Sequence, residues 1–136
     1  MIRIFAGYDA REAVGYHVFS SSVIRRSTDP VAIHPLGLSL LRGYREKHED
    51  GTNDFIYSRF LVPWLQSWIG RALFIDGDMV VTSDIAELFA LVDPYKAVHV
   101  VKHGYDIGQR GHDERPIQLH QLHVAICRRP ASFQHR

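Results

Sequence analysis

Apolar residues follow strand-like and helix-like spacings in turn through the first hundred positions. Ile2 to Ala6 is a short apolar run that predicts a strand, and Gly7, Tyr8 and Asp9 follow as its exit. Asp9 and Glu12 have the D-x-x-E spacing of a capping box, which predicts a helix from Ala10 to about Ser27. The apolar positions expected on the inner side of that helix are Ala13, Val14, Val18 and Ile24.

A second strand and a second helix are predicted further along the chain. Val31 to Ile33 forms a short apolar run before Pro35, and residues 37–51 are polar and mixed, as in a loop with a helical turn over Ser39 to Tyr44. Residues 53–68 have a helix start signal, and Pro63 is expected to end or kink that helix. Its predicted apolar side consists of Phe55, Ile56, Phe60, Leu61 and Trp64.

The stretch from Arg71 to Leu88, RALFIDGDMVVTSDIAEL, contains the third unit. Its Leu-Phe-Ile run is typical of a strand buried on both faces of a parallel sheet. Asp84 and Glu87 have capping-box spacing and predict a helix over Ile85 to Leu91, and Tyr95 to Val101 alternates weakly as a last strand. This order of elements predicts an α/β fold with a mostly parallel sheet flanked by helices.

Composition narrows the class of protein without identifying it. The 136 residues suit one domain, and 46% hydrophobic with 23% charged residues is ordinary for a globular protein. A net charge of +1 gives no field that favours nucleic acid. The single cysteine, Cys127, excludes an internal disulfide, and no stretch reaches the roughly 20 apolar residues of a membrane span. Because the amino terminus also lacks the pattern of a secretory signal or transit peptide, we expect a cytoplasmic protein.

The candidate chemistry centres on Asp76 and Asp78, which follow the predicted strand directly. Gly77 between them is expected to let the chain turn, so that both carboxylates can reach one cation. Mg²⁺ or Mn²⁺ accepts carboxylate and phosphate oxygens together, and ligands of open α/β sheets bind where strands end. The alternative is that D-G-D is a solvated turn, since Asp and Gly are common turn residues.

Three segments together resemble a known family: FAGYDAREAVGY, Y-S-R-F-L-V-P and ALFIDGDMVVTSDIAELF. They are similar to the family 8 type of nucleotide-sugar glycosyltransferases, the group of glycogenin and bacterial lipopolysaccharide galactosyltransferases, and most of all to bacterial glycosyltransferase-like relatives. The resemblance runs from Ile2 to about Tyr105. It implies a Rossmann-like GT-A fold, a UDP-sugar donor, a Mn²⁺-type ion on the D-x-D acids, and transfer with retention to a sugar, lipid-linked or protein acceptor.

The same resemblance implies which residues bind the donor. Asp76 and Asp78 would hold the metal and the diphosphate around Gly77. Gly7, Tyr8 and Asp9 would lie against uridine, and Tyr57 and Arg59 match a Y-x-R motif whose arginine reaches the donor or the D-x-D acids. From the residues alone, Asp9 is equally a helix N-cap, and Arg59 is a surface charge in the alternative interpretation. The resemblance provides no agreed nucleophile, so the catalytic residue stays unknown.

The last part of the chain departs from that family. We expect a nucleotide-sugar-binding domain over residues 1–105, incomplete at its C-terminus, and an atypical tail over 106–136 that is disordered or frameshifted. The histidine that completes the family's metal site has no counterpart, so the chain reads as truncated. His120, His123 and Cys127 would face one side of a helix and could hold zinc only if the tail were helical. His17 and His99 are expected to be packed or surface residues.

Two other functions stay open from the sequence. A non-catalytic, truncated nucleotide-binding fragment would keep the D-x-D turn without turnover, so whether this chain is an enzyme is undecided. An aspartate-nucleophile phosphatase of the haloacid-dehalogenase type also places D-x-D after an apolar strand, with Asp76 as the nucleophile and Asp78 as the acid-base. That motif usually lies near the start of its domain, whereas here it lies past the midpoint of the chain.

Overall fold

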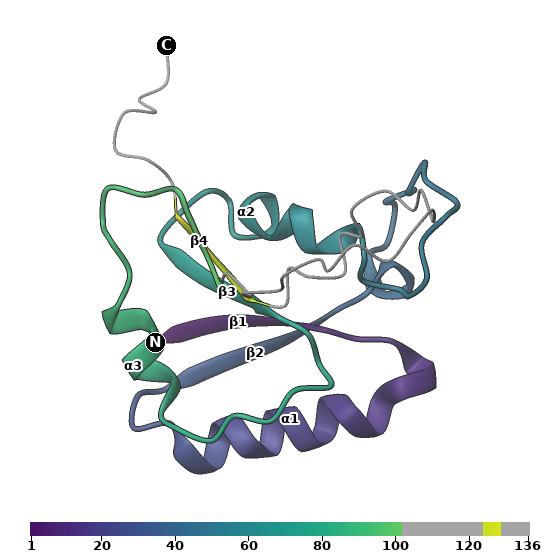
Figure 1. The fold of residues 1–136 in the computed structure, drawn as a ribbon. Helices are drawn as coiled ribbons and strands as arrows, with labels where there is room; N and C mark the ends of the chain where they lie inside the picture. Colours follow the sequence, from purple (N-terminus) through teal and green to yellow (C-terminus); the bar gives the residue numbers. More distant parts are fainter. Residues whose placement is uncertain (102–123, 129–136) are drawn as a thin grey trace, which may run out of the picture.

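The computed structural model describes residues 1–101 and the backbone of residues 124–128. Within these residues the chain forms a five-stranded sheet in the order β2-β1-β3-β5-β4 (Figure 1). The strands are β1 (Ile2–Gly7), β2 (Val31–Leu36), β3 (Arg71–Ile75), β4 (Val98–Val100) and β5 (Val124–Arg128).

Strand β1 is at the centre of the parallel part of the sheet. It pairs in parallel with both β2 and β3, and the register places Gly7 opposite Leu36 and Ala6 opposite Ile75. The carboxyl ends of three strands therefore meet at one edge of the sheet. The segments that follow them, which include Tyr8 and Asp76, start from this edge.

Strand β5 was not predicted from the sequence. It lies between β3 and β4 and is antiparallel to both, so β4 itself runs parallel to β3. An interior strand of five residues is held by hydrogen bonds to two neighbours, and local sequence pattern carries little of that information. The tail is thus not wholly outside the sheet, although the predicted boundary at residue 105 stays a prediction.

Helices cover both faces of the sheet (Figure 1). The short helix η1 (Ala10–Glu12) leads into α1 (Ala13–Arg26), and α1 and α3 (Ile85–Ala90) lie on one face. The helix η3 (Ser58–Leu61) continues into α2 (Val62–Leu65) on the other face, and a further turn, η2 (Leu38–Leu40), follows β2. The predicted α/β fold with helices flanking a mostly parallel sheet is confirmed.

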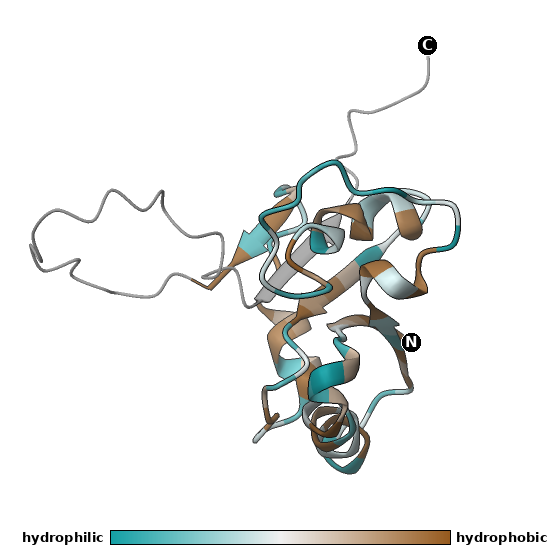
Figure 2. Cartoon of the chain, turned by 90° about the vertical axis from the view of Figure 1, so that its right-hand side faces the viewer, coloured by the Kyte–Doolittle hydropathy of each residue, from teal (hydrophilic) through white to brown (hydrophobic). Residues whose placement is uncertain are grey.

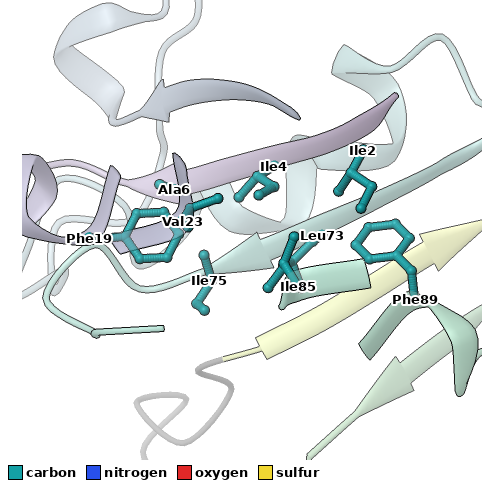
Figure 3. Close-up of a cluster of buried hydrophobic side chains, with 9 residues drawn as sticks. All are labelled: Ile2, Ile4, Ala6, Phe19, Val23, Leu73, Ile75, Ile85 and Phe89. Atoms are coloured by element: carbon teal, nitrogen blue, oxygen red, sulfur yellow. The ribbon is translucent and has the colours of Figure 1, made fainter. Parts of the chain in front are cut away.

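Alternate residues of the central strands enter two separate cores. Ile4 of β1 and Leu73 of β3 point toward α1 and α3, whereas Phe5 and Phe74 point toward η3 and α2. Strand β3 is therefore buried on both faces, as its apolar run predicted. Figure 3 shows the first of these cores, which consists of Ile2, Ile4, Ala6, Phe19, Val23, Leu73, Ile75, Ile85 and Phe89.

The predicted inner side of the first helix is wrong. Val14, Val18 and Ile24 are exposed, and the buried residues of α1 are Phe19, Ser22 and Val23. Figure 2 shows hydrophobic residues in α1 as well as along the central strands. Phe19 and Val23 enter the core, and Ser22 lies between them on the inner side because its hydroxyl accepts a hydrogen bond from the Val81 N–H. A hydrophobicity pattern treats the position of Ser22 as polar and therefore places the inner side of the helix elsewhere.

The prediction for residues 53–68 is only partly right. Phe55 and Ile56 are buried, but Phe60 and Trp64 are exposed. Pro63 lies in the first turn of α2, where its missing N–H costs nothing, so it starts the α-helix and does not end it. The segment ends instead at Ser67 and Trp68, whose φ angles of 54° and 59° are left-handed. The change from 3₁₀ to α geometry shifts the periodicity and turns the two aromatic residues outward.

Candidate functional site

The turn Asp76-Gly77-Asp78 leaves the carboxyl end of β3 and crosses the end of β1. A methyl group on Gly77 would lie 2.0 Å from the carbonyl oxygen of Gly7, so the two backbones are in direct contact. The glycines of the described residues with positive φ are Gly43 and Gly70, and Gly77 is not one of them. Close approach of backbone, and not the conformational freedom we expected, is therefore the reason for glycine at this position.

Asp76 is a buried carboxylate with a buried arginine beside it. The Arg59 Nη2 atom lies 3.4 Å from Asp76 Oδ1, and both side chains are almost fully shielded from solvent. The resemblance implied that the arginine reaches the donor or the D-x-D acids, and in the structure its guanidinium lies beside Asp76. The alternative interpretation of Arg59 as a surface charge is wrong.

Aromatic rings and a carbonyl group hold the Arg59 guanidinium in place. Its central carbon lies 5.0 Å from the ring centroid of Phe74 and 5.6 Å from that of Phe55. Its Nε donates a hydrogen bond to the carbonyl oxygen of Phe55 at 3.4 Å. Burial lowers the pKa of Arg59, and the negative charge of Asp76 acts in the opposite direction. The guanidinium carries its charge, because arginine is not deprotonated in proteins.

Asp78 has different surroundings from Asp76. It is exposed, and its Cα lies 3.3 Å from the position that a methyl group on Gly15 of α1 would take. The chain that follows then runs along α1, where the Ser22 hydroxyl accepts a hydrogen bond from the Val81 N–H at 3.0 Å. The D-x-D turn thus presents one carboxylate to solvent and one to the interior of the protein.

The end of β1 places Tyr8 and Asp9 at the same edge. The ring of Tyr8 packs edge-on against that of Tyr16, with 5.4 Å between their centroids. Asp9 is the N-cap of η1, and its Oδ1 accepts from the Arg11 N–H at 2.9 Å. The N-cap interpretation of Asp9 is confirmed. Hydrogen bonds from Arg11 hold the pKa of Asp9 far below its ordinary value.

Tyr57 contacts a loop and not the D-x-D acids. Its hydroxyl donates to Asp50 Oδ1 at 2.5 Å, and its ring stacks on that of His48 with centroids 4.5 Å apart. The hydrogen bond to Asp50 raises the pKa of the Tyr57 phenol. Of the predicted Y-x-R pair, the described contacts bring only Arg59 to Asp76.

His17 and His99, which were predicted to be packed or surface residues, have these two positions in the structure. His17 is exposed, and His99 Nε2 accepts a hydrogen bond from the Asp93 N–H at 3.0 Å. His120 and His123 lie outside the described residues, and Cys127 lies in strand β5, so the helical spacing required for the zinc hypothesis does not hold at Cys127. In the part of the chain with described side chains, no three His, Cys, Asp or Glu residues gather as a metal site.

Three residues that position the site were not singled out from the sequence, namely Gly15, Ser22 and Asp54, and neither was the contact between Phe55 and Gly7. Phe55 was predicted to be buried, but its partner was unknown. A methyl group on Gly7 would lie 2.7 Å from the Phe55 ring. The glycines were the available signal, because a glycine in a strand or helix often marks a close approach.

Comparisons with known proteins support the fold. No family model matches the chain. It is 41% identical, over 107 residues, to Protein CDI of Arabidopsis thaliana, an alignment that covers 76% of this chain and 41% of that protein. The chain therefore spans about two fifths of the length of this curated relative.

Among solved structures, the chain is similar to the apo structure of the bifunctional glycosyltransferase WbbM. The TM-score is 0.58 at 18% sequence identity, over 75% of this chain and 23% of that one. The likeness shows the fold, which is the α/β Rossmann-like fold of a glycosyltransferase. None of the helices in residues 1–101 has both the length and the apolar character that a membrane crossing requires.

Proposed function

We propose that this chain is the donor-binding part of a metal-dependent glycosyltransferase. It would bind a UDP-sugar with Mn²⁺ or Mg²⁺ on Asp76 and Asp78 and transfer the sugar with retention. The observation that carries this proposal is the D-x-D turn at the carboxyl end of β3, with the charged Arg59 3.4 Å from Asp76. A likeness in fold to a glycosyltransferase is consistent with it.

The two acids would have different roles toward the metal and the diphosphate. Asp78 is exposed and free to turn toward a cation, whereas Asp76 is held by the interior of the protein. Both supply the carboxylate oxygens that hard divalent ions prefer, and phosphate oxygens and water would complete the coordination. A bound ion would neutralise charge on the departing diphosphate. Arg59 adds a fixed positive charge to the same place without cost of reorganisation.

The nucleoside would lie along the end of β1. Gly7 and Tyr8 leave that strand beside the D-x-D turn, and the ring of Tyr8 offers an aromatic face next to Tyr16. Tyr57 would contribute from the neighbouring loop. During transfer, the bond from the anomeric carbon to the diphosphate oxygen breaks, a bond to the acceptor oxygen forms, and the acceptor hydroxyl loses its proton. We assign no residue to that proton.

Calorimetry of UDP binding with and without Mn²⁺ tests the proposal. We expect binding that requires the metal and that Asp78→Asn weakens by at least about tenfold, because loss of one charged ligand costs more than about 1.4 kcal/mol. Asp29→Asn changes an exposed acid near the other end of α1 and should bind as the wild type does. UDP binding that ignores Mn²⁺, or that Asp78→Asn leaves unchanged, would contradict the proposal.

Two further assays distinguish the alternatives. Release of hexose from a UDP-sugar, abolished by Asp78→Asn, would show turnover, whereas metal-dependent UDP binding without release would identify a non-catalytic nucleotide-binding unit. A trapped aspartyl-phosphate on Asp76 would identify the phosphatase. The chain spans 41% of the length of its curated relative. For the whole protein, we propose that the acceptor is a sugar, a lipid-linked sugar or a protein.

A further inference from the structure

Both oxygens of the Asp9 carboxylate accept hydrogen bonds from other residues of the protein. Oδ1 accepts from the Arg11 N–H at 2.9 Å and from Arg11 Nε at 3.0 Å. Oδ2 accepts from Arg11 Nη2 at 2.5 Å and from the Asp54 N–H at 3.3 Å. The side chain is 6% exposed, whereas that of Arg11 is 72% exposed. Asp9 therefore faces the protein, and its partner Arg11 faces solvent.

These bonds join the end of β1 to a segment more than forty positions away. Arg11 Nη2 also donates to the Thr52 carbonyl oxygen at 3.2 Å. Asp9 and Arg11 together therefore hold residues 52–54 in place by hydrogen bonds. Asp54 in turn holds the chain that leaves β2. Its carboxylate accepts from the N–H and the hydroxyl of Ser39, and its carbonyl oxygen accepts from the Leu38 N–H at 2.7 Å.

Residues 52–54 lead directly to Arg59, the buried arginine of the candidate site. Phe55 follows Asp54, its ring lies against Gly7, and its carbonyl oxygen accepts from both the N–H and the Nε of Arg59. Arg59 then reaches Asp76. A continuous set of contacts thus runs from Asp9 through Asp54 and Phe55 to the D-x-D acids.

We propose that Asp9 is a positioning residue, which sets the Arg59 guanidinium against Asp76 by holding residues 52–54, and that it does not read the nucleotide base. This inference rests on the proposed donor site and assigns Asp9 a role different from the uridine contact that the family resemblance implies. Its chemical consequence concerns the phosphates. Loss of Asp9 should weaken every nucleoside diphosphate to the same extent, because Arg59 and the D-x-D acids act on the end of the ligand that all of them share.

Binding of UDP and CDP with Mn²⁺ separates the two roles. Uracil N3–H can donate to a carboxylate, whereas cytosine N3 has no hydrogen to donate, so a base-reading Asp9 would favour UDP and Asp9→Asn would reduce that preference. For a positioning Asp9 we expect Asp9→Asn to weaken both ligands by about tenfold with an unchanged UDP to CDP ratio. A changed ratio would overturn the proposal.

Arg11 provides a second variant on the surface of the protein. Arg11→Gln removes the guanidinium contacts to Asp9 and Thr52 while leaving the Asp9 carboxylate in place. It should therefore weaken binding in the same direction as Asp9→Asn, and the double variant should add little to Asp9→Asn alone. Arg25→Gln, which changes an exposed arginine of α1, is the matched control and should bind as the wild type does. Normal binding by Arg11→Gln would contradict the positioning role, even if Asp9→Asn did not fold.

A measurement without nucleotide keeps this inference separate from the proposed function. The Nε–H proton of a buried arginine is slow to exchange and can be followed by NMR. In the ligand-free protein we expect Asp9→Asn and Arg11→Gln to shift the Arg59 Nε–H signal and to speed its exchange, and Arg25→Gln to leave it unchanged. An unaltered Arg59 signal in both Asp9→Asn and Arg11→Gln would refute the positioning role. Failure of the wild type to bind UDP with Mn²⁺ would refute only the proposed donor site.

Discussion

The Arg59 guanidinium lies 3.4 Å from the Asp76 carboxylate, and each of these side chains is buried. In an ion pair of this kind, the attraction between the two charges offsets the free-energy cost of removing them from water. If one charge is removed, the other stays buried without compensation. Because Asp76 also belongs to the D-x-D turn, the pair connects the stability of the core to the candidate donor site. Variants of either residue should therefore affect folding and ligand binding together.

Replacing Arg59 tests this connection. Arg59→Met keeps the length and apolar stem of the side chain but removes its charge from a buried carboxylate, and we expect it to lower the free energy of unfolding by about 3 kcal/mol. Arg25→Met, at an exposed position of α1, should cost less than about 0.5 kcal/mol. Urea unfolding followed by circular dichroism measures both. Equal stability of the two variants would show that the buried pair contributes nothing.

The contact between Gly77 and Gly7 predicts a severe effect of a single methyl group. Gly77→Ala would place its Cβ 2.0 Å from a carbonyl oxygen, and we expect a loss of at least about 3 kcal/mol or failure to fold. Gly43→Ala is the comparison, since Gly43 has positive φ and nothing within 4 Å of the added carbon. Its cost should be only about 1 kcal/mol, from backbone strain. Similar thermal unfolding of the two variants would contradict the close packing of β1 and the D-x-D turn.

The side of residues 53–68 that faces the core can be tested with two phenylalanines. Phe55 is buried against Gly7, whereas Phe60 is about half exposed. We expect Phe55→Ala to lower the free energy of unfolding by about 3 to 5 kcal/mol and Phe60→Ala by less than about 1 kcal/mol. Chemical denaturation of both variants measures the two losses. The original sequence pattern, with both rings inside, would instead predict equal losses.

The lowered pKa values of two carboxylates, Glu46 and Asp9, predict that the folded protein loses stability in acid. The hydrogen bond from His48 lowers the pKa of Glu46 from 4.5 to about 2, and hydrogen bonds from Arg11 lower that of Asp9 below its ordinary 3.8. A pKa that is lower in the folded state means that the unfolded state binds protons more readily. The stabilising contribution is therefore complete above about pH 5 and decreases as the pH falls through these values.

Asp9→Asn and Glu46→Gln measure the two contributions separately. Unfolding in urea between about pH 6 and pH 3 should show a steeper decline for the wild type than for either variant, because each variant lacks one of the groups that takes up a proton on unfolding. Asp29→Asn is the control at an exposed acid and should follow the wild-type curve. Parallel curves for all four proteins would mean that neither carboxylate is stabilised by folding.

Much of the architecture followed from local pattern. The runs Ile2 to Ala6 and Leu73 to Ile75 form central strands, and Asp84 caps α3 by accepting from the Ala86 N–H. These features depend on residues next to one another, where periodicity and capping chemistry are decisive. The pattern failed for α1 and for residues 53–68, where the inner side is chosen by what packs against it.

The D-x-D acids illustrate the limit of the sequence most clearly. Their place after β3 was evident from an apolar run followed by two acids, so the sequence alone determined a parallel α/β fold with carboxylates at a strand end. Only the tertiary structure decided that Asp76 is buried against Arg59, that Gly77 touches Gly7, that Asp9 turns inward, and that β5 enters the sheet. Each of these contacts joins residues far apart in the chain, and their formation depends on the shape of the assembled core, which no local spacing records.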